Sequence, residues 1–256
     1  MEYFVKQDSI VREIWGKGDT ILFIFAGASA EFALNKAVDW LYFTGKLPGD
    51  PLGRLFSTVT YARKIVFSEK AAAHHAIDKI TAIHSAIEQS RDARIPDWAY
   101  RDVLFMLIHY SIAAYELLER KLMTEEKEQV YDVFYRFGER MNLIGLPRSY
   151  SEWVIMRKDH LSTNLQNSHF TVDLYKQYKK HLGLIRYQLL IDGQKLVIPQ
   201  EAKDLLKLGK FSSLTLILPI YKLSRKVGVD SLFKDLILPN KYKKEIKDLD
   251  ISPLVK

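Results

Sequence analysis

The amino-acid sequence predicts an all-α protein: a single globular helical bundle around a buried polar pocket, followed by a basic C-terminal appendage. Apolar residues recur at helical spacing along nearly the whole chain, and no strand-like alternation persists for more than a few residues. Capping residues, glycines and prolines separate the apolar stretches. The chain has 256 residues, of which 48% are hydrophobic, so it can bury one sizeable core. We expect a core domain over residues 1–199 and the appendage over 200–256.

Local start signals place the first three helices, which we expect over residues 20–42, 51–67 and 69–89. Asp19 or Thr20 can cap the first of them. Asp50 caps the second, with Pro51 at the first helical position, where a missing N–H has no cost. Ser68 is suited to cap the third. The run 20–43 is the most apolar of the chain, but it includes charged residues at helical spacing, which favours a core helix over a membrane span.

The later helices are expected over residues 98–120, 124–141, 149–165 with Ser149 or Ser151 at its start, 171–181 with 184–190 as a candidate continuation, and 199–208. The first of these has few charges in its middle and should be central. The sequence Thr124-Glu125-Glu126-Lys127 is a capping box. Residues 191–198 are expected to form a turn with extended flanks. Glycines and prolines then divide the chain into short pieces, which indicates the boundary near residue 200.

Composition excludes several classes of function. The chain has no cysteine, so disulfides, iron–sulfur clusters, zinc–thiolate sites and cysteine nucleophiles are excluded. It contains no P-loop, zincin, nucleophile-elbow or dinucleotide-binding motif, and nothing that indicates a nucleic-acid partner. The polar N-terminus lacks the features of a signal peptide, so we expect a cytoplasmic protein.

The charge of the chain is concentrated near its C-terminus. The net charge is +7, and residues 200–256 contribute 12 basic and 7 acidic side chains. A lysine-rich solvated surface explains this most simply. Contact of the basic tail with a membrane surface is the alternative.

Arg54 and Thr58 lie four residues apart on one expected helix and therefore share a face. A guanidinium on a face that packs against the core needs a partner or a bound anion. One interpretation is a structural ion pair with Asp39 or Glu31, and spacing alone favours it. The other is a clamp on a carboxylate or phosphate group of a ligand.

His84 lies among isoleucines on the next helix, on or beside its apolar face. A lone histidine there is more often a core residue than a ligand, but a neutral imidazole on a rigid helix is also a good ligand for haem iron. His109, in the apolar run of the expected central helix, has the same two interpretations.

These residues also occur in a familiar order. The sequence Gly53-Arg54-Leu55-Phe56-Ser57-Thr58, preceded by Asp50-Pro51 and followed by the helix Ala82–Ile87 around His84, resembles the helical family of the latex-clearing protein (rubber oxygenase) and the endoplasmic-reticulum oxygenase of mycophenolic acid biosynthesis. The resemblance continues through Leu104–Tyr115 and covers about Trp15 to His181.

The resemblance implies a b-type haem in an all-α fold, with His84 as the proximal iron ligand. It places Arg54 and Thr58 on the distal side or near the propionates, and His109 as a support of the pocket. Members of the family cleave isoprenoid double bonds with oxygen bound at ferrous haem. This chain departs from the family at Ser57, where the latex-clearing protein has a lysine that can cap the iron.

The sequence thus leads to the hypothesis of a haem b-dependent oxygenase that uses molecular oxygen on an apolar or isoprenoid-derived small molecule. In it, His84 ligates iron, Arg54 pairs with a propionate or an oxygen species, Thr58 supplies a hydroxyl, and Glu31 accepts a proton. The alternatives are a non-enzymatic interaction or peripheral-membrane module, and the same pocket with a non-haem carboxylate ligand.

Overall fold

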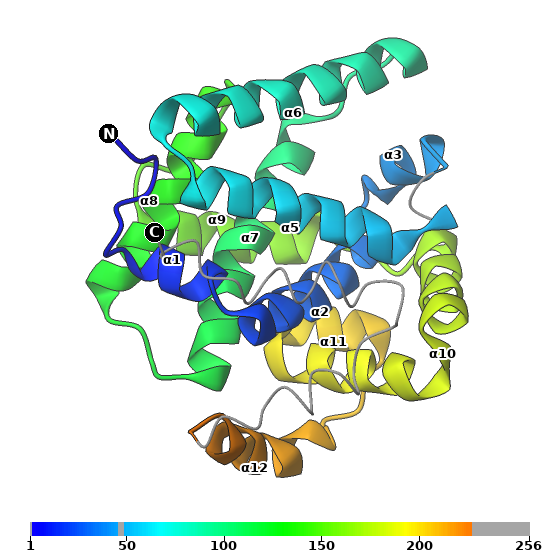
Figure 1. The fold of residues 1–256 in the computed structure, drawn as a ribbon. Coiled ribbons are helices and arrows are strands. Elements are labelled where there is room, and N and C mark those ends of the chain that lie inside the picture. The colour runs from blue at the N-terminus through cyan, green and yellow to red at the C-terminus, as the bar shows by residue number, and fades with distance from the viewer. Residues whose placement is uncertain (1, 46–48, 227–256) are drawn as a thin grey trace.

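The computed structural model describes residues 2–45 and 49–226, and within these ranges the chain is helical, with two isolated β-bridges and no extended strand. The all-α fold class predicted from the sequence is confirmed (Figure 1). The helices are α1 (Ile10–Trp15), α2 (Gly18–Leu34), α3 (Val38–Phe43), α5 (Pro51–Phe67), α6 (Lys70–Arg91), α7 (Asp97–Leu118), α8 (Thr124–Arg140), α9 (Tyr150–Thr163), α10 (His169–Val197), α11 (Gln200–Leu206) and α12 (Leu214–Lys226).

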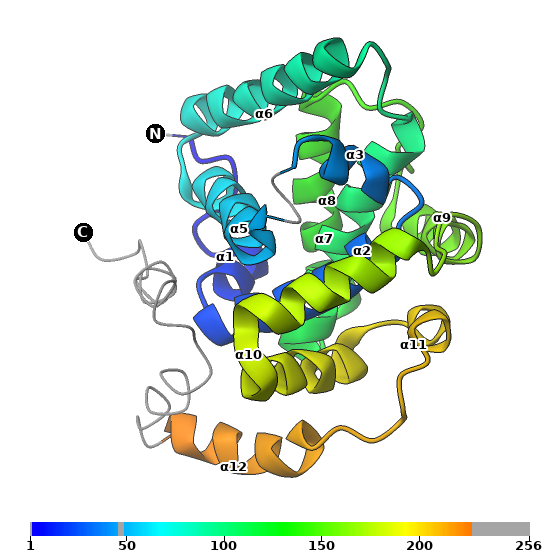
Figure 2. The same cartoon turned by 90° about the vertical axis from the view of Figure 1, so that its right-hand side faces the viewer.

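The centre of the bundle is the pair α2 and α7, with α10 packed against another side of α2 (Figures 1 and 2). Small residues in the middle of α2 allow this close approach. At Gly27 an added Cβ would lie 2.2 Å from the ring of Tyr110 on α7. Only glycine fits between these two helices at that position, which explains a residue that otherwise weakens a helix.

Local capping chemistry sets several helix ends as the sequence predicts. Asp50 accepts a hydrogen bond from the backbone N–H of Gly53, and Pro51 begins α5. Ser149 accepts one from the N–H of Glu152 at the start of α9. The expected capping box of α8 is only half formed: Met123 and not Thr124 is the N-cap residue, its side chain makes no capping hydrogen bond, and Glu126 accepts a hydrogen bond from its N–H.

The first expected helix is broken, contrary to the prediction of one helix over 20–42. α2 ends at Leu34, and Asn35 takes an extended conformation. The side-chain oxygen of Asn35 accepts a hydrogen bond from the N–H of Ala37, and such side-chain bonds compete with helical ones. Backbone bonds to the segment before α10 complete the break: Gln166 donates to Leu34 and Lys36 donates to Asn164.

The prediction of a turn with extended flanks over residues 191–198 is wrong, because α10 continues through Val197. The long helix bends instead at Gly183, whose φ of +72° is in the left-handed region that favours glycine. Buried contacts hold the second half against α2: Gln194 donates a hydrogen bond to Ser29 Oγ and accepts one from Tyr175.

The boundary that we expect near residue 200 falls at the turn between α10 and α11, and it stays a prediction. α11 packs against α2 and α9, and α12 packs against α10. Residues 227–256, which make up most of the predicted appendage, lie outside the described residues. None of the helices in the described ranges is long and apolar enough to cross a membrane.

Candidate functional site

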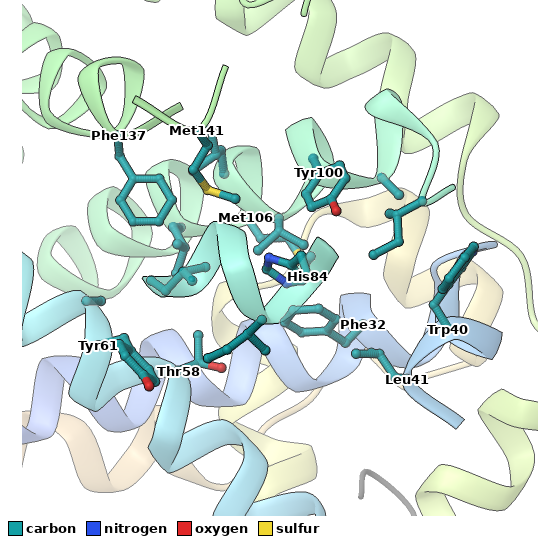
Figure 3. A pocket seen from close by; sticks show the side chains of 18 of the residues that line it. Phe32, Trp40, Leu41, Thr58, Tyr61, His84, Tyr100, Met106, Phe137 and Met141 are labelled. Carbon is teal, nitrogen blue, oxygen red and sulfur yellow. The ribbon is translucent and has the colours of Figure 1, made fainter. Parts of the chain in front are cut away.

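A cavity of about 650 Å³ lies among α3, α5, α6, α7 and α8, and Arg54, Thr58 and His84 all line it. The structure therefore brings together the three residues on which the sequence hypothesis depends. Figure 3 shows the Thr58 and His84 side chains among Phe32, Tyr100 and other cavity residues. The cavity volume is within the range of about 300–1,000 Å³ that is common for cofactor and small-molecule sites.

Arg54 is fixed by its own helix. Its Nη1 donates hydrogen bonds to Thr58 Oγ1 at 3.0 Å and to Ser57 Oγ at 3.3 Å. Both hydroxyls in turn donate to the backbone carbonyl of Arg54. The i to i+4 spacing thus produces a contact that orients the guanidinium at the cavity wall.

The ion-pair interpretation of Arg54 is wrong. Asp39 pairs with Arg91 at 2.7 Å, and Glu31 pairs with Arg157. Among residues 2–45 and 49–226, no carboxylate lies within ion-pairing distance of Arg54. Burial lowers the pKa of Arg54 because a desolvated cation is costly. The guanidinium is nevertheless charged at neutral pH, so it is suited to an anionic group of a ligand.

His84 reaches the cavity from α6, and its ring contacts the ring of Tyr100 edge-on at 5.3 Å. Its Nδ1 is buried without a hydrogen-bond partner of good geometry within the described residues. Burial, followed by the positive charge of Arg54, lowers the pKa of His84. The imidazole is therefore neutral at neutral pH, which is the form that ligates a metal.

The rest of the cavity wall is largely apolar. Aliphatic, aromatic and methionine side chains cover it, among them Phe32, Ile80, Leu104, Met106 and Phe137. Within the described part of the chain, no three His, Cys, Asp or Glu side chains gather as a metal site. An iron at His84 would therefore need most of its ligands from a cofactor.

Glu31 does not line the cavity but belongs to a separate buried group, here called the Glu31 cluster: Glu31, Asp102, Tyr110, Arg157 and His160. Arg157 donates to both carboxylate oxygens of Glu31, with Nη2 at 2.5 Å from Oε2. Tyr110 donates to Glu31 at 2.7 Å, and His160 Nε2 lies 3.0 Å away. Burial would raise the pKa of Glu31, but these partners outweigh it and hold the pKa far below its usual range.

His160 lies between two carboxylates, because its Nδ1 is 2.6 Å from Asp102. Burial opposes its charge, but the contacts with Asp102 and Glu31 outweigh burial and raise the pKa of His160. The cluster thus sets the Arg157 guanidinium and the His160 imidazole against the carboxyl groups of Glu31 and Asp102. Asn35 donates to Asp102 and also lines the cavity, so it connects the two sites.

The structure places His109 beside the Glu31 cluster and not on the cavity wall. Its ring contacts Tyr110 edge-on at 4.9 Å. Burial, together with the charge of Arg157, lowers the pKa of His109 to about 4. A place outside the cavity fits a supporting residue better than an iron ligand.

Sequence reasoning missed Arg157 and His160. Both lie on α9 at the spacing of its buried residues Trp153 and Leu161. A charged residue at a position that continues an apolar face was the available signal.

The described part of the chain is thus a helical domain with an apolar cavity, where a neutral histidine and an arginine without a carboxylate partner lie on neighbouring helices. Comparison with family models identifies this domain. Residues 15–230 match the ER-bound oxygenase mpaB/B′/rubber oxygenase catalytic domain, and the chain belongs to this family, as the sequence resemblance predicts. It therefore has an oxygenase-type catalytic domain. No curated protein and no solved structure matches the chain.

Proposed function

We propose that the protein binds haem b in the cavity, with His84 as the iron ligand, and oxidises an apolar or isoprenoid-derived small molecule with molecular oxygen. The observation that carries the proposal is the position of His84. Its imidazole is neutral, lies on an apolar wall and has a buried Nδ1 for which the described part of the chain offers no hydrogen-bond partner of good geometry. A single histidine holds iron firmly only when a macrocycle supplies the equatorial ligands, as in haem proteins.

The other residues fit the same cofactor. Apolar walls suit the faces of a porphyrin, and Arg54 provides a cation without a carboxylate partner for a propionate. Thr58 donates its hydroxyl hydrogen to a backbone carbonyl and accepts from Arg54. We therefore assign Thr58 to orienting Arg54.

Bound haem would supply the activation of oxygen. The chain supplies the surroundings: the apolar wall excludes water and favours an apolar substrate, and Arg54 stabilises negative charge at one edge of the cavity. A role of Glu31 as proton acceptor requires release of its pair with Arg157, so the proposal rests on Arg54, Thr58 and His84.

The test is haem titration of the purified full-length chain, followed by its Soret absorbance. Wild type and His109→Gln should both bind one haem with the spectrum of a histidine ligand. His84→Ala should lose that spectrum and regain it with added imidazole. Arg54→Met should weaken haem binding by about tenfold, the effect of losing about 1.4 kcal/mol. An unchanged spectrum in His84→Ala, or no Soret band in wild type, would contradict the proposal.

The unpaired Arg54 also favours a second candidate, a carboxylate ligand without haem in the same cavity. A medium-chain fatty acid would then raise the melting temperature of wild type and not of Arg54→Met. Equal shifts in both proteins would exclude this candidate.

A further inference from the structure

Helix α12 presents an apolar face to solvent. Leu216, Ile220 and Leu223 are 69%, 62% and 63% exposed. They are spaced at i, i+4 and i+7, so they lie on one side of the helix. Scattered exposed leucines are ordinary, but an apolar row along one helix indicates an interaction surface.

The orientation of α12 is set by polar contacts on its other side. Tyr221 donates a hydrogen bond to Asp19 at 3.1 Å, and Arg225 lies 2.5 Å from Glu119. Ser213, just before the helix, donates to Asp192 at 2.6 Å. These contacts fasten α12 to α2, α7 and α10, below them in Figure 2, so its apolar row points away from the bundle.

The charge around the row is positive. Residues 200–226 contain six basic and two acidic side chains, and α12 itself has no acidic residue. Arg225 is paired with Glu119 and Asp19, but Lys210 and Lys222 have no carboxylate partner among the described residues. Phe211 is 66% exposed and follows the exposed Lys210. An apolar helical row with flanking cations and an aromatic residue is typical of a helix that lies in a membrane interface. Anionic lipid complements both features, because its headgroups attract the cations and its acyl chains accept the apolar row.

We propose that α12 docks on an anionic lipid surface, with Leu216, Ile220 and Leu223 buried at the boundary between headgroups and acyl chains. Phe211 enters the same layer, and Lys210 and Lys222 contact the headgroups. The helix lies along the surface and does not cross the bilayer. The docking stands independently of the cofactor in the cavity.

The test is co-sedimentation of the full-length chain with lipid vesicles. One set contains phosphatidylcholine alone, and the other also contains about 30% phosphatidylserine. The variant Leu216→Gln/Ile220→Gln/Leu223→Gln removes the apolar row. The matched control Ile144→Gln/Val154→Gln/Ile155→Gln changes three apolar residues that are 68%, 45% and 71% exposed elsewhere. Circular dichroism and urea midpoints establish that both variants are folded.

Wild type and the control should bind anionic vesicles at least about tenfold more tightly than the α12 variant, and salt should weaken the binding. Equal binding by the α12 variant would overturn the proposal. No binding by wild type would also overturn the proposal. Size-exclusion chromatography would then identify the alternative. A dimer that the α12 variant loses would mean that a second copy covers the row, and a monomer would mean that the chain itself covers it.

Discussion

Replacing Arg157 with methionine tests the Glu31 cluster. Glu31 is 0% exposed, and Arg157 is 4% exposed and donates to both of its carboxylate oxygens. Methionine retains much of the side-chain volume but removes the charge. The variant leaves a buried carboxylate without its cation, which typically costs about 3–5 kcal/mol.

The contacts that remain place the expected cost at the lower end of this range. Tyr110 and His160 still contact Glu31, at 2.7 and 3.0 Å. We therefore expect a loss of about 3 kcal/mol in the free energy of unfolding, out of the total of about 5–15 kcal/mol that is typical for a domain. With a urea m-value of about 2–3 kcal/mol per molar, the midpoint should fall by about 1–1.5 M.

The assay is urea denaturation followed by circular dichroism, with Arg140→Met as the control. Arg140 also makes two bonds to a carboxylate, Asp78, at 2.7 and 2.6 Å, but the two side chains are 44% and 48% exposed. The control should lose less than about 1 kcal/mol. Glu31→Gln/Arg157→Met should be less destabilised than the two single changes together, by about 2 kcal/mol. Equal midpoint shifts in the buried and exposed variants would refute the reasoning.

Further predictions concern pH and packing. Because folding raises the pKa of His160, protonation of His160 stabilises the folded state. This contribution is complete below about pH 6.5 and is lost as pH rises through the folded pKa. His160→Gln should therefore remove this loss from the alkaline side of the urea-stability profile. The pKa of His109 is lowered to about 4 and acts in the opposite sense. Its contribution to the free energy of unfolding is highest above about pH 6.5 and declines toward pH 4, by at most about 3 kcal/mol. His109→Gln should flatten that decline. Gly27→Ala should cost about 1–3 kcal/mol in thermal denaturation, because its Cβ would lie 2.2 Å from the Tyr110 ring. The control Gly193→Ala should be close to neutral, because its Cβ would lie 3.4 Å from the nearest atom. Similar costs for the two variants would contradict the packing argument.

The parts of the fold that the sequence predicts depend on interactions between near neighbours in the chain. The starts of α5 and α9 can be predicted from local chemistry, because the capping partners Asp50 and Gly53, and likewise Ser149 and Glu152, are three residues apart. The break at Asn35 is only partly predictable, because its side-chain bond to Ala37 is local but the backbone partners of Leu34 and Lys36 are near residue 165, about 130 positions away. The continuation of α10 through Gln194 likewise depends on a distant contact with Ser29.

The site divides in the same way. The contact of Arg54 with Thr58 follows from helical spacing, and the order of the family motif adds His84 to the same cavity. The environment of Glu31 does not follow, because its partner Arg157 is 126 residues away. A helical pattern shows which face of a helix is buried but not which residue meets it there.

Arg54 and Arg157 differ in whether a carboxylate neutralises their charge. Arg157 is buried and fully compensated within the Glu31 cluster, which makes it a part of the core. Arg54 is desolvated at a cavity wall, and the neighbours that accept its hydrogen bonds are neutral hydroxyls. A desolvated cation without a neighbouring anion lowers the stability of the folded protein. Selection tolerates such a cost mainly where the binding of an anionic ligand offsets it. We therefore propose that an anionic group of a cofactor or substrate binds in the cavity beside Arg54, and not at the Glu31 cluster.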